Sequence, residues 1–106
     1  MNNQDLISEL KNSSNLLGSF LKQNFFNKIN QTIESEFGIL YNRFNNLLNE
    51  CNLQLNLNEQ DTINLLNETN PFNKMNEAEI DMVQTFFEDC VISYYSRTKT
   101  LSLVVN

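Results

Sequence analysis

The candidate catalytic and metal-ligating side chains of this chain are its carboxylates and its two thiols. The 106 residues include 13 Asp and Glu together with Cys51 and Cys90, but no His. Histidine is the commonest general base and metal ligand, so its absence excludes Ser-His-Asp and Cys-His catalysis and any zinc site that contains histidine. Gly18 and Gly38 are the only glycines, which excludes a glycine-rich loop of the kind that cradles nucleotides.

The carboxylates form no pattern typical of a catalytic or metal site. A glycosidase needs two carboxyl groups facing one cleft, and a chain of 106 residues leaves little room for a cleft that holds a sugar. Di-metal helical bundles use Glu-x-x-His motifs, and an EF-hand needs alternating acids around a central glycine; neither pattern is in the sequence. We therefore expect no enzymatic activity, no cofactor and no bound metal.

The acidic residues are concentrated in the second half of the sequence. The chain carries seven Lys and Arg, which gives a net charge of −6. Residues 59–89 hold eight acids against one base, Lys74, whereas the first 53 residues are close to neutral. This distribution predicts an acidic surface and a protein partner with a basic surface. A nucleic-acid partner is not expected, because phosphate contacts need a Lys and Arg footprint that the sequence lacks.

The cysteines and the chain start indicate a cytoplasmic protein. Cys51 and Cys90 lie 39 residues apart without a CxxC motif, and each falls on an apolar stripe, so we expect reduced core cysteines; the alternative is one disulfide between helices. The first residues lack the pattern of a signal peptide. The longest apolar run is three residues, so we expect no segment that spans a membrane and no membrane partner.

Elements that position these residues are predicted from apolar periodicity. Residues 4–23 have one apolar helical stripe, with Ser13 and Ser14 where a further apolar residue is due, so a local break can occur there. Residues 26–51 have a second stripe. In one straight helix the two stripes would face directions about 140° apart, so one side could not bury both. We therefore expect a turn near residues 23–27 between them. The two helices therefore form an antiparallel hairpin.

The stripe of the second helix is the strongest pattern in the sequence. Its members are Phe26, Ile29, Ile33, Phe37, Leu40, Phe44, Leu47 and Cys51. Their spacings of three and four place them within an arc of about 80° at 100° per residue, which is close to a coiled-coil seam. Two interpretations remain open. The stripe is core that packs on the chain's own first helix, or it is a seam between molecules, such as a homodimer interface or a groove for a client helix.

Two shorter helices and a tail follow. Asn58 with Asp61 predicts the N-terminus of a third helix that carries Ile63 and Leu66 and ends before Asn70-Pro71. Asn76 with Glu79 predicts the start of a fourth helix over 77–95. Its expected core side is a set of six residues: Ile80, Val83, Phe87, Cys90, Val91 and Tyr94. Residues 98–105 alternate loosely and are rich in β-branched residues, so they pair with residues 53–57 as a two-stranded ribbon or pack as an irregular tail.

The fourth helix carries the candidate binding residues. Glu77, Asp81 and Glu88 fall within an arc of about 40°, opposite the expected core side. Ile92 and Tyr95 extend the same side. One interpretation is an acidic face with an apolar edge that docks a basic partner protein. The other is a solvated helix face that keeps the protein soluble.

The sequence predicts a single all-α domain over residues 1–106, a small helical bundle built on the antiparallel hairpin. We expect a non-enzymatic, acidic protein-binding module that sequesters, neutralises or carries one partner, in the manner of a chaperone, an immunity protein or an anti-regulator. The alternative is a constitutive structural subunit of a larger helical or coiled-coil assembly, with the second helix buried against other chains.

Overall fold

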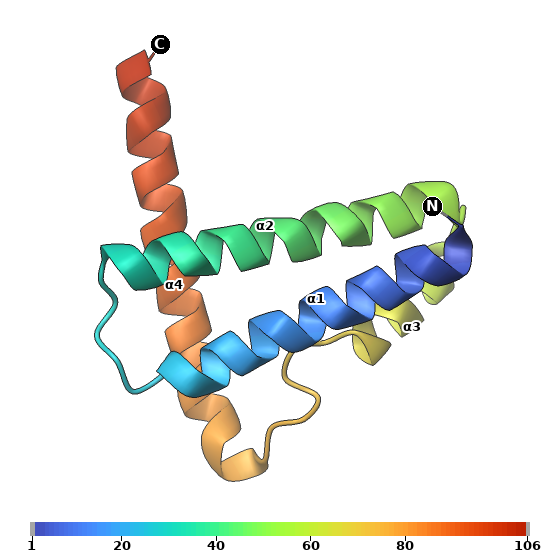
Figure 1. Ribbon diagram of the computed structural model, residues 1–106, viewed down its shortest axis with the longest axis horizontal. Coiled ribbons are helices and arrows are strands. Elements are labelled where there is room, and N and C mark those ends of the chain that lie inside the picture. The colour runs from blue at the N-terminus through green and yellow to red at the C-terminus, as the bar shows by residue number, and fades with distance from the viewer. Residues whose placement is uncertain (1, 106) are drawn as a thin grey trace.

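A computed structural model describes the backbone of residues 2–105 and the side chains of residues 2–96. It contains four helices, α1 (Asn3–Asn24), α2 (Gln31–Gln54), α3 (Glu59–Glu68) and α4 (Glu77–Val105), and no strand within residues 2–105. The predicted all-α class is therefore confirmed. α1 and α2 lie side by side as the antiparallel hairpin, α3 lies at the end of the hairpin where α2 stops, and α4 crosses both hairpin helices steeply (Figure 1).

Each helix begins at an asparagine whose side chain caps it. The Oδ1 atoms of Asn2, Asn30, Asn58 and Asn76 accept hydrogen bonds from the backbone N–H three residues later, at 2.8, 2.9, 2.8 and 3.0 Å. These bonds satisfy backbone donors that no helical carbonyl can reach. At α4 the exchange is reciprocal, because Glu79 Oε1 accepts from the Asn76 N–H at 3.2 Å. The predicted caps at Asn58 and Asn76 are thus confirmed.

The second helix begins five residues later than predicted. Residues 25–30 form the connection between α1 and α2, and the Asn30 cap starts α2 at Gln31. The apolar spacing runs on through this connection, which is why the sequence pattern places the helix start at 26. Phe26, the first residue of the predicted stripe, consequently lies outside the helix with 75% of its surface exposed.

The predicted ribbon does not form. Residues 98–105 continue α4 as helix, and Leu53 lies in the last turn of α2 with 81% of its surface exposed. α2 ends because Asn56 adopts a left-handed backbone conformation, with φ of 51°, which asparagine tolerates better than most residues. The alternation of leucines from 53 to 57 thus reflects a helix end and a turn rather than an extended segment.

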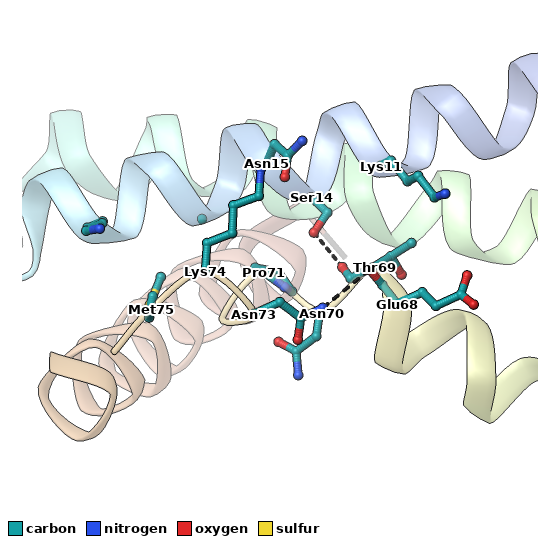
Figure 2. Close-up of a pocket in the computed structure, with 12 residues that line it drawn as sticks. Lys11, Ser14, Asn15, Glu68, Thr69, Asn70, Pro71, Asn73, Lys74 and Met75 are labelled. Atoms are coloured by element: carbon teal, nitrogen blue, oxygen red, sulfur yellow. Dashed lines mark hydrogen bonds between the residues drawn. The ribbon is translucent and has the colours of Figure 1, made fainter. Parts of the chain in front are cut away.

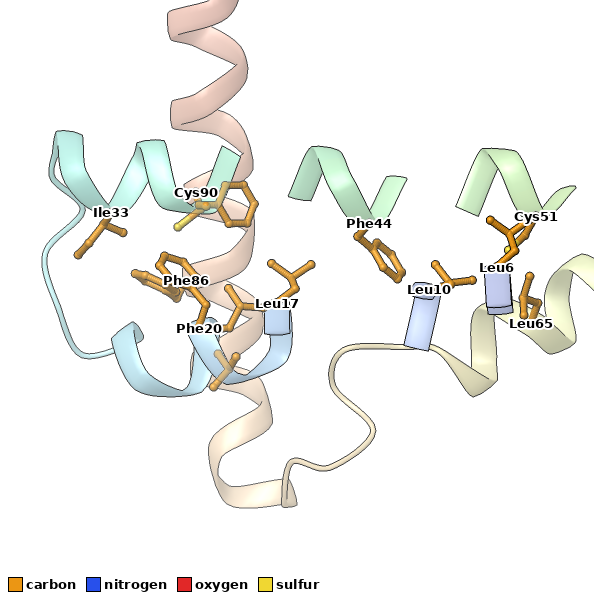
Figure 3. Close-up of a cluster of buried hydrophobic side chains, with 13 residues drawn as sticks. Leu6, Leu10, Leu17, Phe20, Ile33, Phe44, Cys51, Leu65, Phe86 and Cys90 are labelled. Carbon is orange, nitrogen blue, oxygen red and sulfur yellow. The ribbon is translucent and has the colours of Figure 1, made fainter. Parts of the chain in front are cut away.

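The core lies between α1, α2 and α4 and extends along the hairpin to α3. α1 is continuous through Ser13 and Ser14, and both side chains are buried. Figure 3 shows Phe20, Ile33, Phe86 and Cys90 gathered where α4 crosses the hairpin, and Leu6, Cys51 and Leu65 gathered at the α3 end.

The third helix buries a different residue from those predicted, whereas the fourth helix buries most of its predicted side and one residue more. In α3 the buried residue is Leu65, whereas Ile63 and Leu66 are exposed. In α4 Val83 and Cys90 are buried as predicted and Phe86 is also buried. The remaining four predicted members are half-buried: Ile80, Phe87, Val91 and Tyr94.

Both glycines lie where another segment approaches a helix closely. A Cβ atom at Gly18 would lie 2.6 Å from the carbonyl oxygen of Pro71, and a Cβ at Gly38 would lie 2.5 Å from the ring of Tyr94. Neither separation is compatible with normal van der Waals contact. Gly18 therefore lets the segment after α3 pack on α1, and Gly38 lets α4 pack on α2.

Candidate functional site

The candidate residues of the fourth helix all lie on the outer face of α4. Glu77, Asp81 and Glu88 are exposed, and Ile92 and Tyr95 have 64% and 51% of their surfaces exposed. At 100° per residue the five side chains span an arc of about 60°, and Val83 and Cys90, which are fully buried, point the other way. We refer to these five residues as the α4 outer face.

The three carboxylates of the outer face have no basic partner among the described side chains. Within residues 2–96, no Lys or Arg nitrogen lies within 4.0 Å of a carboxylate oxygen of Glu77, Asp81 or Glu88. The neighbouring acid Glu79 differs, because its Oε1 lies 3.5 Å from Lys22 Nζ on α1 and also closes the capping box. Glu79 therefore holds the start of α4 in place, while the three outer carboxylates face solvent.

An apolar hollow of about 310 Å³ borders the outer face at Glu88 and Ile92. Its lining also includes Tyr41 from α2 and Phe87 and Val91 from α4. The ring of Tyr41 stacks on Phe37 with centroids 5.1 Å apart and meets the edge of Phe87 at 5.7 Å. The floor of this hollow is thus fixed by aromatic packing onto the core.

Tyr95 stands beside the same hollow. Its ring is perpendicular to that of Tyr41, with centroids 6.4 Å apart. The nearby Tyr41 hydroxyl, and to a lesser extent desolvation, raises the pKa of Tyr95 above its ordinary value of 10.0. Tyr95 therefore presents a neutral hydroxyl, which can donate or accept a hydrogen bond, beside an apolar hollow.

A second hollow of about 460 Å³ borders the outer face at Asp81. It is lined by Phe25 and Phe26 of the α1–α2 connection and by Met82 and Thr85 of α4. The two phenylalanine rings lie 4.0 Å apart, and Met82 has 57% of its surface exposed. Exposed aromatic and methionine side chains around a shallow hollow are typical of protein-binding surfaces.

Contacts between α2 and α4 hold the outer face in place. Ser93 Oγ donates to Glu34 Oε2 at 3.0 Å, and Asn42 Nδ2 donates to the Tyr94 hydroxyl at 2.5 Å. With the Gly38 contact to Tyr94, these bonds anchor α4 where it crosses α2. The C-terminal part of α4 continues beyond α2 and projects from the body of the molecule (Figure 1).

The predicted seam of the second helix lies mainly in the chain's own core. Ile33, Phe37, Phe44 and Cys51 are buried. Ile29, Leu40 and Leu47 are half-buried and pack against the same core. Apart from the exposed Phe26, this stripe therefore packs largely within one molecule.

Only part of the walls of the two hollows was identified from the sequence. Tyr41, Phe25 and Met82 were not among the predicted site residues, because they lie on other elements or on the flank of the α4 stripe. The sequence contains one indication of these walls, because the apolar Met82 lies near the polar, exposed residues Asp81 and Thr85. No sequence pattern indicates that Phe25 and Phe26 lie beside Met82 in the folded chain.

Comparisons of the chain with protein-family models, with curated proteins and with solved structures find no match. In the described part of the chain, no helix combines the length and the apolar character that crossing a membrane requires. Within the same residues, no three Cys, Asp or Glu side chains are grouped so that they could hold a metal ion. Both cysteines are buried and unbonded.

Proposed function

We propose that this protein is a non-enzymatic cytoplasmic binding module that sequesters, neutralises or carries a partner protein, as chaperones, immunity proteins and anti-regulators do. The observation that supports the proposal is the arrangement on α4. Three carboxylates without a described basic partner run along one exposed face, and two apolar hollows border that face. We name this combined surface, the α4 outer face with its two hollows, the docking surface.

The chemistry of the docking surface defines the partner. Apolar side chains of a partner would enter the hollows at Tyr41 and Met82, where aromatic and methionine contacts give most of the affinity. Lys or Arg side chains of the partner would pair with Glu77, Asp81 and Glu88, which mainly accelerates association and selects the register. The best match is a basic amphipathic segment with apolar and cationic residues on one side.

The scaffold favours binding without rearrangement. α4 is capped at Asn76, tied to α1 through Lys22 and Glu79, and anchored to α2 through Ser93 and Tyr94. A surface held in its binding geometry loses less conformational entropy when a partner docks. The α2 stripe contributes little to this surface, since most of it is buried in the core.

Charge reversal tests the proposal. The variant Glu77→Lys/Asp81→Lys/Glu88→Lys should bind a synthetic helical peptide with leucine and lysine on one face at least about 100-fold more weakly, because the new lysines repel those of the peptide. This loss corresponds to about 2.8 kcal/mol. Isothermal titration calorimetry measures the dissociation constant, and far-ultraviolet circular dichroism checks that the helix content is unchanged. The proposal requires that capture of the native partner by the same variant is also lost.

A matched control separates the docking surface from net charge. Asp5→Lys/Glu36→Lys/Glu50→Lys changes the net charge by the same amount at three exposed acids on α1 and α2 that have no ion pair among the described side chains. This control should keep the peptide affinity within a factor of about three, the small effect of distant exposed charges in salt. Equal losses in the two variants would refute the site assignment.

A further inference from the structure

A separate hollow of about 330 Å³ lies between α1 and the segment that connects α3 to α4. On α1 it is lined by a stripe of residues about one turn apart, and on the other side by residues 68–71 and 73–75 (Figure 2). It shares no lining residue with the two hollows of the docking surface. Any ligand of this hollow therefore binds at a site separate from the partner on α4.

The charge of this hollow is opposite to that of the molecule. The chain has a net charge of −6 and only five lysines, yet Lys11, Lys22 and Lys74 all line the hollow. Glu79 neutralises Lys22 at 3.5 Å. Among the described side chains, no carboxylate oxygen lies within 4.0 Å of the Lys11 or Lys74 nitrogen. Two uncompensated ammonium groups thus border one concave site whose single carboxylate is Glu68.

The wall opposite α1 is held rigidly by polar contacts. Ser14 Oγ donates to the Thr69 carbonyl oxygen. Asn73 Nδ2 donates to the Asn67 carbonyl oxygen at 2.8 Å, and Asn70 Oδ1 accepts from the Phe72 N–H at 2.9 Å. The hollow is therefore formed before any ligand binds, and the protein loses little conformational entropy on binding.

The absence of a side chain at Gly18 makes room for this arrangement. Because Gly18 has no Cβ, the carbonyl group of Pro71 can lie directly on α1. In Figure 2 the Lys74 side chain crosses from the connecting segment toward α1 and ends beside Asn15, while Lys11 lies farther along α1. Lysine from one side and an asparagine amide from the other thus meet at the same hollow, and both are donors to an anion.

We propose that this hollow binds the phosphate group of a small anionic ligand. Lys11 and Lys74 supply the positive charge, and the Asn15 amide supplies a neutral donor. Lysine binds phosphate as a point charge and needs no glycine-rich loop to do so. Two ammonium groups match a multiply charged anion better than a monoanion, so a phosphate or diphosphate group is preferred to chloride or acetate.

Titration with inorganic pyrophosphate tests the proposal. Amide chemical shifts of the ¹⁵N-labelled full chain should change saturably, with the largest changes at residues 11–18 and 69–75. The variant Lys11→Gln/Lys74→Gln should raise the dissociation constant at least about tenfold, as the loss of charge-assisted hydrogen bonds predicts. Circular dichroism checks that the variant keeps its helices.

The control variant is Lys28→Gln, which removes one exposed lysine that does not line the hollow. It should leave the pyrophosphate dissociation constant within about twofold of the unchanged chain, because a distant exposed charge is screened by salt. A loss of affinity in Lys28→Gln equal to that in the double variant would overturn the proposal. Shift changes that are not saturable, or that spread evenly over all lysines, would overturn it as well.

Discussion

At the residue scale, Gly18 shows how one missing side chain fixes the path of a distant segment. Gly→Ala at an exposed helix position usually stabilises a helix by up to about 1 kcal/mol. At Gly18 the new Cβ would lie 2.6 Å from the Pro71 carbonyl oxygen, a backbone atom that cannot rotate away. At Gly38 the obstacle is the Tyr94 ring, which can shift as a side chain.

We therefore expect Gly18→Ala to lower the free energy of unfolding by about 1–3 kcal/mol, the usual cost of overpacking. Urea unfolding followed by circular dichroism measures the change. Ser19→Ala, at the next and exposed position of α1, is the control and should be neutral or slightly stabilising. A Gly18→Ala variant at least as stable as the unchanged chain would contradict the close approach of Pro71.

The thiol of Cys90 gives a pH dependence that follows from its position. Burial, reinforced by the charges of Asp89 and Glu34, raises the pKa of Cys90 from 9.0 to about 12. The native state therefore keeps this proton at pH values where the unfolded chain loses it. Since the unfolded state then binds fewer protons, the stability that Cys90 contributes is complete below pH 9.0 and decreases as the pH rises toward about 12.

Urea unfolding between about pH 8 and about pH 10.5 should show this decrease, with Cys90 contributing a slope of up to about 1.4 kcal/mol per pH unit. Cys90→Ala is expected to be less stable at neutral pH, because it leaves a small cavity, but its stability should fall less steeply with pH. Identical slopes in the two proteins would show that the native thiol ionises as readily as the unfolded one.

At the element scale, asparagine explains where the helices begin. The chain contains 20 asparagines, and four of them cap the four helices: Asn2, Asn30, Asn58 and Asn76. Asparagine is a strong N-cap residue and a weak former of helix interiors. The same residue type therefore stabilises helix starts and weakens helix interiors in this protein.

Two alanine substitutions should separate these roles. Asn76→Ala removes the Oδ1 acceptor at the start of α4 and should cost about 1 kcal/mol of unfolding free energy. Asn46→Ala, at an exposed interior position of α2, should be neutral or stabilise by up to about 0.7 kcal/mol. Urea unfolding measures both. Equal effects of the two substitutions would contradict the capping role of Asn76.

A helix boundary can be predicted from the sequence when the residues that determine it are close together in the chain. The caps at Asn58 and Asn76 are contained within four residues, so the sequence alone locates them. The predicted start of α2 was wrong because the apolar spacing continues through Phe26 and hides the Asn30 cap. The predicted ribbon was wrong because alternating leucines near Leu53 and a β-branched tail also fit helical structure.

At the scale of the whole molecule, the folded chain separates its charges. The outer face of α4 carries exposed carboxylates, whereas three of the five lysines meet in the hollow between α1 and residues 68–75. The acidic half of this pattern is visible in the sequence, because Glu77, Asp81 and Glu88 recur at helical spacing. The basic half is not, because Lys11 and Lys74 are 63 positions apart in the sequence.

The hollows of the docking surface depend on tertiary packing in the same way. Tyr41 and Ile92 border one hollow, and Phe26 and Met82 border the other, although each pair is about 50 residues apart or more. Helical periodicity identifies which face of α4 is polar, but it does not identify which residues of other elements stand beside it. The acids and the apolar edge at Ile92 and Tyr95 were thus predictable from the sequence, whereas the residues of other elements beside them, such as Tyr41, could be found only from the fold.

We propose that the docking surface on α4 binds a basic amphipathic segment, and chemical-shift mapping locates such binding residue by residue. The ¹⁵N-labelled chain is titrated with the leucine–lysine peptide, and the amide shift changes are mapped onto the structure. We expect saturable changes concentrated at residues 77–95, around Tyr41 and around residues 25–26. Changes that follow acidic residues equally on α1, α2 and α3, or that remain after charge reversal at Glu77, Asp81 and Glu88, would contradict the proposal.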